Sequence, residues 1–233
     1  MARRHRQGHR RALRRRRGEG FITGRREAPL RAAASELGDS VVPIVSDASR
    51  LGDLDTLFEA VARHGKLDIL VANAGGSATA ALGSITEEQF DREFDVNVKG
   101  LLFTVQNALP HLVDGASIVL LGSTQGSSGV AGMSVYSAAK AAVRSFARSW
   151  ILDLKDRAIR VNVVSPGPVD TDAFQDYVRE QGEAVLAHLH QAIPLGRVAQ
   201  PQDVAAATLY LASQDAAYIN GIELFVDGGM RQV

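Results

Sequence analysis

The chain of 233 residues contains no cysteine, which excludes disulfide bonds, thiol catalysis and cysteine-based zinc sites. It also has no apolar run long enough to cross a membrane and no apolar segment typical of a secretory signal. We therefore expect a cytoplasmic protein without a membrane partner. His188 and His190 form a lone His-x-His pair. Such a pair is a weak metal motif, so we expect no metal and place both histidines on an exposed helix face.

The formal net charge of zero hides an uneven distribution of charge. Nine arginines lie within the first 17 residues, which leaves 17 basic against 26 acidic residues in the remainder, a net charge of −9. An acidic body argues against a nucleic-acid partner. The length and an apolar content of 45% indicate one globular domain with a substantial core.

Three polar residues give the first indication of chemistry. Lys140 follows Tyr136 by four residues, and Ser123 precedes it by thirteen. A Tyr-x-x-x-Lys spacing on a helix sets both side chains on one face, and an ammonium beside a phenol lowers the phenol pKa from its usual value of about 10. With the Ser123 hydroxyl nearby, this arrangement suits proton transfer to or from a carbonyl or alcohol oxygen. The same spacing of Tyr and Lys is also common on plain helix surfaces.

Strand and helix patterns alternate along the body of the chain. We expect parallel strands at 41–45, 67–72, 117–121, 160–164 and 222–226, and helices at about 27–37, 53–64, 86–112, 136–156 and 201–213. This alternation predicts an α/β fold with a doubly wound parallel sheet. Ser123 would then lie at the carboxyl end of a strand, where open parallel sheets bind their ligands.

Further short motifs occur in a fixed order. They are Asn73-Ala74-Gly75 after the strand at 67–72, Asn97 in Phe94-Asp-Val-Asn-Val-Lys-Gly100, Pro166-Gly167-Pro-Val169-Asp-Thr171 after the strand at 160–164, and Asp227-Gly228-Gly229. With Ser123, Tyr136 and Lys140, they make the chain similar, from about Phe21 to Gly229, to the short-chain dehydrogenase/reductase family, in the manner of its 3-oxoacyl-thioester reductases. The resemblance implies a single Rossmann-type domain and an NAD(P)H-dependent oxidoreductase that interconverts a small-molecule carbonyl and a secondary alcohol.

The resemblance also implies a role for each matched residue. Tyr136 would be the general acid/base, Ser123 would orient the substrate carbonyl, and Asn97 would hold a water. Lys140 would lower the pKa of the tyrosine and hold the nicotinamide ribose. The cofactor would further contact Asp47, Ala48, Asn73, Ala74, Gly75, Pro166, Gly167, Val169 and Thr171.

Arg25, in Thr23-Gly24-Arg25-Arg26, occupies the turn at which family members that prefer NAD usually carry an acid. A basic residue there complements a 2′-phosphate, so NADP(H) is favoured over NAD(H). The alternative is a solvated Arg pair that opens a helix. The resemblance further implies a homo-oligomer, a dimer or homotetramer, and a cover for the substrate pocket formed by 172–195, the least patterned part of the body.

The beginning of the chain departs from the family. Members have a first strand and a Thr-Gly-x-x-x-Gly-x-Gly turn that receives the pyrophosphate at a helix N-terminus. Residues 1–20 contain nine Arg and no apolar strand. The family's strand order is 3-2-1-4-5-6-7, so the missing strand is a central one. Its loss would leave two neighbours unpaired and open the core.

The genetic code suggests an explanation for residues 1–20. Read one base later, codons that are allowed by residues 4–20 can spell Gly-Ile-Gly-Lys-Ala-Thr-Ala and then Phe-Ala-Ala-Asp-Gly-Ala-Arg-Val, which supplies the family's glycine turn, first helix and second strand. We therefore interpret 1–20 as an aberrant segment translated out of frame and 21–233 as a Rossmann-type domain. A basic arm for nucleic acid and a transit peptide are alternatives for the segment. For the whole chain, the alternative to an active enzyme is a catalytically silent product with impaired cofactor binding.

Overall fold

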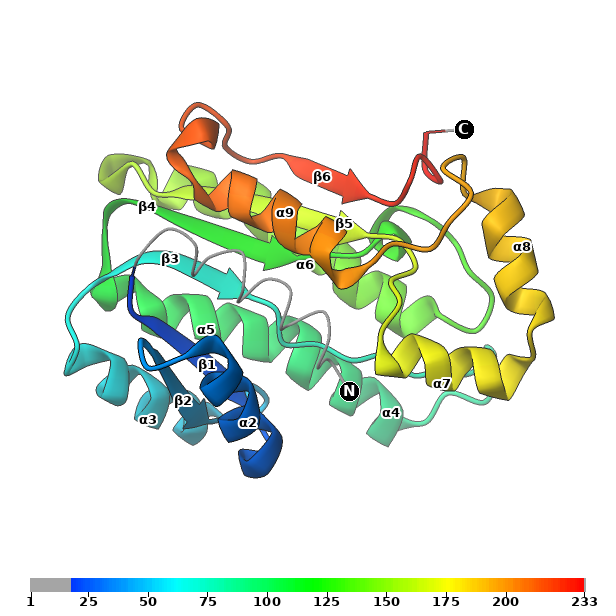
Figure 1. The fold of residues 1–233 in the computed structure, drawn as a ribbon, viewed down its shortest axis with the longest axis horizontal. Helices are drawn as coiled ribbons and strands as arrows, with labels where there is room; N and C mark the ends of the chain where they lie inside the picture. The colour runs from blue at the N-terminus through cyan, green and yellow to red at the C-terminus, as the bar shows by residue number, and fades with distance from the viewer. Residues whose placement is uncertain (1–17, 233) are drawn as a thin grey trace.

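The computed structural model describes residues 18–232, so the expectations for the Arg-rich segment up to residue 17 lie outside the described residues. Strands and helices alternate along the rest of the chain (Figure 1). The strands are β1 (Gly20–Gly24), β2 (Val41–Val45), β3 (Leu67–Ala72), β4 (Leu112–Leu121), β5 (Arg160–Pro166) and β6 (Glu223–Val226). The α-helices are α2 (Glu27–Leu37), α3 (Leu51–Ala62), α4 (Glu87–Phe94), α5 (Gly100–Ala108), α6 (Ser134–Asp153), α7 (Asp172–Gln181), α8 (Ala184–Ala192) and α9 (Pro201–Ala212).

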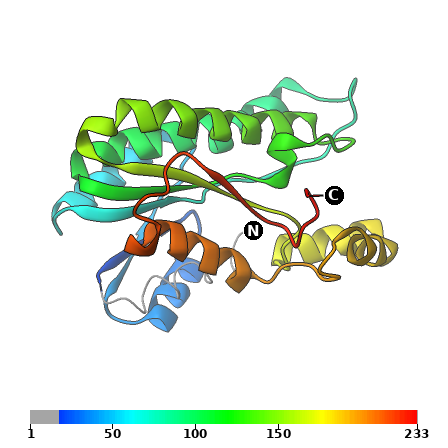
Figure 2. The same ribbon diagram turned by 90° about the horizontal axis from the view of Figure 1, so that it is seen from above.

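All strand pairs are parallel, and helices cover both faces of the sheets. Helices α3, α5 and α6 pack on one face, and α2 and α9 on the other (Figure 2). The expected doubly wound α/β fold is therefore confirmed. The strands of the larger sheet, β3 to β6, point toward α7 and α8, which lie beyond the carboxyl ends of β5 and β6 (Figure 1).

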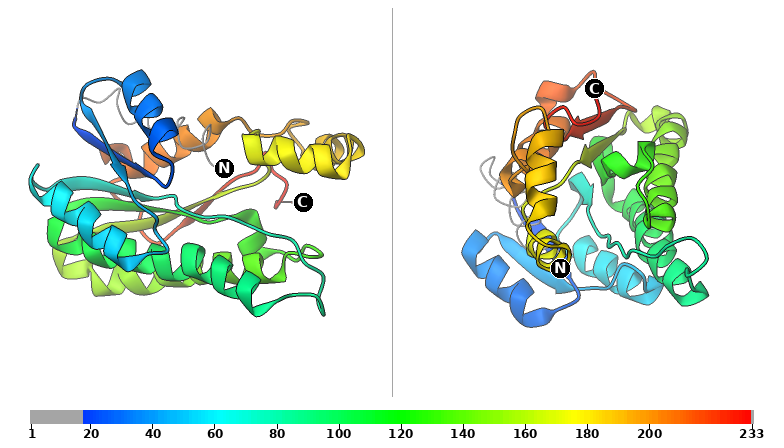
Figure 3. Two further views of the ribbon diagram at one scale, coloured as in Figure 1. Left: turned by 90° about the horizontal axis from the view of Figure 1, so that it is seen from below. Right: turned by 90° about the vertical axis from the view of Figure 1, so that its right-hand side faces the viewer.

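The main departure from a continuous sheet is a break between β1 and β3. The described strands form a two-stranded sheet, β1-β2, and a four-stranded sheet, β3-β4-β5-β6. Within residues 18–232, β1 pairs only with β2 and β3 only with β4, and the left view of Figure 3 shows β1, β2 and α2 (blue) as a unit beside the larger sheet. This is the arrangement expected when the family's first strand is absent.

The break changes how well the strands are buried. The central side chains of β4 and β5, including Ile118, Val119 and Val163, are completely buried between helix layers. The apolar residues of β2 are only partly covered, and Val45 remains 49% exposed. Because apolar burial is the dominant favourable term in folding, the four-stranded unit contributes most of the stability and the β1–β2 unit contributes less.

Two expected elements differ from the structure. The single helix expected over 86–112 is interrupted by a π-helical turn, Asp95–Lys99, and ends in a 3₁₀ turn, Leu109–His111, after which β4 begins five residues earlier than expected. The π turn carries the buried Asn97, whose amide bonds to backbone outside the helix. The segment 172–195, the least patterned part of the body in the sequence, forms α7 and α8; Gly182 ends α7 with a positive φ of 88°.

Candidate active site

Tyr136 and Lys140 lie on the first two turns of α6, which follows the carboxyl end of β4. Lys140 Nζ lies 5.7 Å from the centre of the Tyr136 ring and donates a hydrogen bond to the Leu121 carbonyl at 2.8 Å. The lysine therefore links the helix to the last residue of β4. The expected pairing of the two side chains on one helix face is present in the structure.

Ser123 reaches the same place from the loop after β4. It caps the 3₁₀ turn Thr124–Ser127, because its Oγ accepts a hydrogen bond from the Gln125 amide at 3.2 Å. Its side chain also hydrogen-bonds Tyr136. Gly122, just before it, must be a glycine, since an added Cβ would lie 2.3 Å from Ser165 Oγ on β5. This close approach of β4 and β5 fixes where the loop, and with it the Ser123 hydroxyl, leaves the sheet.

Asn97 is completely buried on the π turn and ties α4 to the segment that follows β3. Its Nδ2 donates to the Gly76 carbonyl at 2.8 Å and to the Glu93 carbonyl at 2.9 Å. Gly75 lies between Asn97 and Lys140, because a Cβ on it would lie 2.9 Å from Asn97 Oδ1 and 3.3 Å from Lys140 Nζ. The ends of β3 and β4, the π turn and α6 thus meet at one point.

The protonation of this site differs from the sequence expectation in one respect. Burial raises the pKa of Tyr136, the hydrogen bond from Ser123 partly offsets this, and the charge of Glu93 raises the pKa further. Lys140 was expected to lower the tyrosine pKa, but burial instead lowers the pKa of Lys140 itself to about 8. A buried ammonium that loses solvation favours its neutral form, which weakens its ability to stabilise a phenolate.

The residues expected to hold the adenosine half of a cofactor gather in one pocket between the two sheets. Arg25, Asp47 and Ala48 line it from the ends of β1 and β2, and 73–75 line it from the end of β3. One oxygen of the Asp47 carboxylate accepts hydrogen bonds from the amide and hydroxyl of Ser49 at 3.1 and 2.8 Å. Arg25 is exposed at the mouth of the pocket.

The segment Pro166–Thr171 lies at the same edge of the sheets but does not line that pocket. Gly167 passes close to β6, since a Cβ on it would lie 3.0 Å from that of Asp227. Val169 forms a bridge to Ala199, and Thr171 caps α7 by accepting a hydrogen bond from the Phe174 amide at 3.2 Å.

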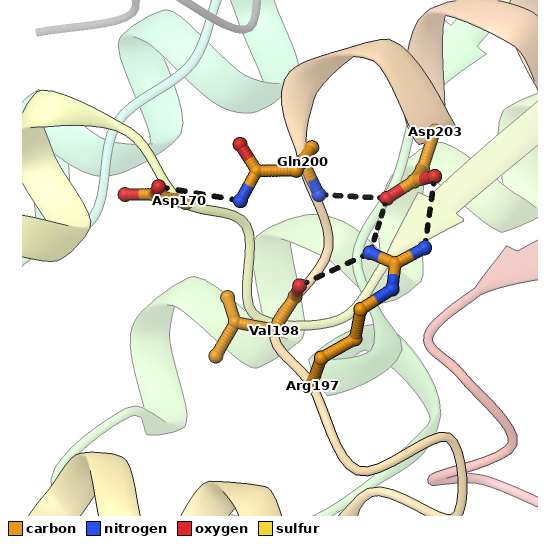
Figure 4. A network of polar contacts seen from close by, with 5 residues as sticks. All are labelled: Asp170, Arg197, Val198, Gln200 and Asp203. Carbon is orange, nitrogen blue, oxygen red and sulfur yellow. Dashed lines mark hydrogen bonds and ion pairs between the residues drawn. The ribbon is translucent and has the colours of Figure 1, made fainter.

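A polar network holds this segment against the start of α9 (Figure 4). Gln200 Nε2 donates to the Asp170 carboxylate at 3.3 Å, and the Gln200 amide donates to Asp203 at 2.7 Å. Arg197 donates to both oxygens of Asp203, at 2.7 and 3.1 Å. This pairing lowers the pKa of the Asp203 carboxyl below its ordinary value. The network orients 166–171 without taking part in the Tyr136 cluster.

One site residue was missed by the sequence analysis. Glu93 is only 3% exposed, and it lies one helical turn before Asn97, near Tyr136. Its neighbours in the sequence are mostly polar, so the pattern does not distinguish it from the exposed acids of α4. The spacing of four residues from Asn97 is the only signal that places it on the same helix face. His188 and His190 are exposed on α8, as expected.

Comparison with known proteins agrees with this arrangement. The family described as enoyl-(acyl carrier protein) reductase matches residues 12–231. The chain is 44% identical to the oxidoreductase asL5 of Sarocladium schorii, covering 91% of this chain and 86% of that protein. It is 38% identical to elsinochrome reductase 1 of Elsinoe fawcettii, covering 84% and 77%. A short-chain dehydrogenase/reductase from Serratia marcescens superposes with a TM-score of 0.91 at 31% identity, covering 98% of this chain and 94% of that one.

Proposed function

The chain belongs to the short-chain dehydrogenase/reductase family, and from this premise we propose that it is an NADP(H)-dependent oxidoreductase that interconverts a carbonyl compound and a secondary alcohol. The observation that carries the proposal is the cluster at the end of β4. A phenol, a hydroxyl and an ammonium, from Tyr136, Ser123 and Lys140, meet there within hydrogen-bond and ion-dipole range. Such a set can hold a carbonyl oxygen and exchange a proton with it.

The residues present fit the two ends of an extended dinucleotide. Gly75 lines the pocket at the end of β3 and packs closely against Asn97 and Lys140, since a Cβ there would lie 2.9 and 3.3 Å from their side chains. Asp47 and Ala48 line the same pocket from the end of β2. Asn73, Ala74 and Gly75 would follow the adenosine half, whereas Lys140 and the 166–171 segment would contact the nicotinamide half. Within residues 18–232, no glycine-rich turn precedes β1 to receive the pyrophosphate. When bound, the nicotinamide would supply or accept the hydride.

The protein's own contribution is position and proton transfer. Tyr136 Oη would donate its proton to the carbonyl oxygen, and Ser123 Oγ would hold the same oxygen in place. Because burial keeps the pKa of Tyr136 above its ordinary value, the phenol is protonated at neutral pH, as reduction requires. Lys140, with a pKa of about 8, also holds its proton at neutral pH and keeps positive charge near the phenol.

Arg25 supports a preference for NADP(H). It is exposed at the mouth of the pocket, next to Asp47 and Ser49, where the ribose of a bound adenosine would lie. A guanidinium is suited to bidentate binding of a phosphate. Several acids of α4 line the neighbouring recess, so Arg25 would be needed to offset their repulsion of a 2′-phosphate.

One observation favours the second candidate, a catalytically silent product. The break between β1 and β3 divides the wall of the cofactor pocket into two sheets that share no hydrogen bonds within the described residues. Without hydrogen bonds between the two sheets, the binding residues on either side of the pocket are less rigidly positioned relative to each other, and this loss of preorganisation weakens binding. An out-of-frame origin of residues 1–20 would explain why the first strand is missing and would therefore support this candidate. Sequencing of the locus tests that origin.

The family also supports homo-oligomer formation, and we propose that α5 and α6 supply the contact. The outer face of α6 exposes small residues and the apolar Leu152. No helix within residues 18–232 is both long and apolar enough to span a bilayer. A cytoplasmic location remains a prediction.

A fluorescence titration with NADPH, and with NADH in parallel, tests the proposal. The full chain should bind NADPH more tightly than NADH. Arg25→Glu should weaken NADPH binding by about tenfold or more, as expected for a lost charge-assisted contact, and leave NADH binding unchanged. Arg26→Glu, a matched change at the next exposed residue, should alter neither. Absence of binding to either cofactor would support the silent product instead, and equal effects of the two substitutions would refute the role of Arg25.

A further inference from the structure

Glu93 is a carboxyl group buried inside the protein beside the proposed active site. Its residue is 3% exposed, on α4. Burying a charged group without full compensation is costly, and the desolvation here raises the pKa of the Glu93 carboxyl. Acidic side chains are rarely found fully buried unless they are paired. The position therefore requires an explanation.

Only one of the two carboxylate oxygens of Glu93 has a hydrogen-bond partner. Oε1 accepts a hydrogen bond from the Ala78 amide at 3.1 Å, whereas Oε2 is buried with no hydrogen-bond partner. On its own helix, the Gln89 side chain and the charge of Arg92 favour the charged form of the carboxyl, and the titratable group that it affects across the site is Tyr136 on α6. An apolar side chain of similar size would avoid the cost of the unpaired oxygen. The carboxyl is thus not explained by packing alone.

Through its hydrogen bond with the Ala78 amide, Glu93 holds the segment 76–80, which forms one wall of the site. Asn97 Nδ2 holds the Gly76 carbonyl at 2.8 Å, and the Ala80 amide donates to the Gly132 carbonyl at 2.9 Å. Residues 76–80 therefore connect the end of β3 to the loop that leads into α6, and Glu93 fastens the middle of this connection. Loss of that bond would free the segment between its two fixed ends.

The charge of Glu93 acts on the same site. Burial has the largest effect and raises the pKa of Tyr136; the Ser123 hydrogen bond favours the phenolate, and the Glu93 carboxylate disfavours it. Burial lowers the pKa of Lys140 to about 8, so this residue keeps its positive charge at neutral pH and loses it at higher pH than 8. A negative charge beside a phenol favours the form that still carries its proton.

We propose that Glu93 is a positioning residue of the Tyr136 site: its carboxyl group fixes the wall formed by residues 76–80 through Ala78, and its charge favours the protonated, proton-donating form of Tyr136. The consequence for turnover rests on the proposed function. The two physical effects do not, and they are measurable in the chain without cofactor or substrate.

The experiment compares three variants of the full chain. Glu93→Gln removes the charge and keeps an oxygen that can accept from Ala78. Glu93→Leu removes both the charge and the acceptor. Glu88→Gln, on the exposed side of the same helix, is the matched control for a lost charge. Fluorinated tyrosine, incorporated throughout the chain, brings phenol titration toward neutral pH, and ¹⁹F NMR then follows Tyr136, which is assigned by comparison with Tyr136→Phe.

We expect Glu93→Gln to move the Tyr136 titration midpoint to lower pH by about one unit, the lower end of what a neighbouring charge does. Glu88→Gln should leave it in place. Amide hydrogen exchange at Ala78 should become faster in Glu93→Leu and stay near the wild-type rate in Glu93→Gln. An unchanged or raised midpoint in Glu93→Gln would overturn the electrostatic part, and unchanged exchange at Ala78 in Glu93→Leu would overturn the anchoring part. Neither readout depends on cofactor binding or activity, so failure here is distinct from failure of the proposed function.

Discussion

Replacing Gly75 with alanine should damage the point at which the ends of β3 and β4, the π turn and α6 meet. The new Cβ would lie 2.9 Å from Asn97 Oδ1 and 3.3 Å from Lys140 Nζ. Neither neighbour moves easily. Asn97 is completely buried and its amide donates two hydrogen bonds, and Lys140 is held by the Leu121 carbonyl. One of these bonds must lengthen or the backbone must shift.

The cost follows from this geometry. Overpacking by one methyl group in a tight interior costs about 1–3 kcal/mol. Gly75 has no positive φ, so alanine also restricts the unfolded chain and returns about 0.4–1 kcal/mol. We expect a net loss of about 1–2 kcal/mol. In urea, at a slope of about 2 kcal/mol/M, this corresponds to a lower midpoint by about 0.5–1 M.

The next residue supplies a matched control. Gly76 also has no positive φ, and a Cβ on it would meet nothing within 4 Å. Gly76→Ala should therefore be neutral or slightly stabilising. Urea unfolding followed by Trp150, the single tryptophan, compares the two variants directly. Equal midpoints for the two alanine variants would refute the packing described around Asn97.

Three further predictions concern charge and burial. Lys140→Met should stabilise the fold at pH 7, by up to about 3 kcal/mol, because burial lowers the pKa of Lys140 in the folded chain to about 8. Between pH 8 and about 10.4 the unfolded chain binds more protons than the folded chain, so the stability of the wild type should rise with pH over that range. Thermal melts should therefore show the difference between wild type and variant at pH 7 and its disappearance near pH 10. Asp203→Asn should cost up to about 1 kcal/mol at neutral pH, as for an exposed ion pair. Because Arg197 lowers the pKa of Asp203, the wild-type advantage should disappear in melts as pH falls through that lowered value. Val163→Ala, in the fully buried centre of β5, should cost about 2 kcal/mol, and Val42→Ala, on the half-covered β2, should cost clearly less; equal losses in urea would contradict the unequal burial of the two sheets.

Much of the fold follows from local pattern. The bounds of α2, β2 and β3 match their expected ranges, because alternating apolar runs and helical periodicity are strong over these segments. The break between β1 and β3 also follows from sequence, since a parallel strand needs a partner and no apolar run precedes β1. Ser123, Tyr136 and Lys140 come together as their spacing on a strand end and a helix predicts.

The remainder depends on contacts that sequence spacing does not contain. The π turn at Asp95–Lys99 arises where Asn97 bonds to backbone after β3, a contact 21 residues away. The burial of Glu93 depends on how α4 packs against α6 and the 76–80 segment, and the shifted pKa values follow from that burial. The bounds of α7 and α8 were not predicted, because polar residues interrupt the apolar positions of α7 and the two helices are separated only by the Gly182 stop after the Thr171-capped α7.

The central claim is that Tyr136 transfers the proton in a nicotinamide-dependent reduction. Oxidation of NADPH at 340 nm, measured against a panel of ketones and quinones with wild type and Tyr136→Phe, tests it most directly. We predict wild-type turnover and a loss of at least about 10²-fold in the variant, with NADPH affinity unchanged by fluorescence titration. Turnover in Tyr136→Phe equal to that of wild type would contradict the claim.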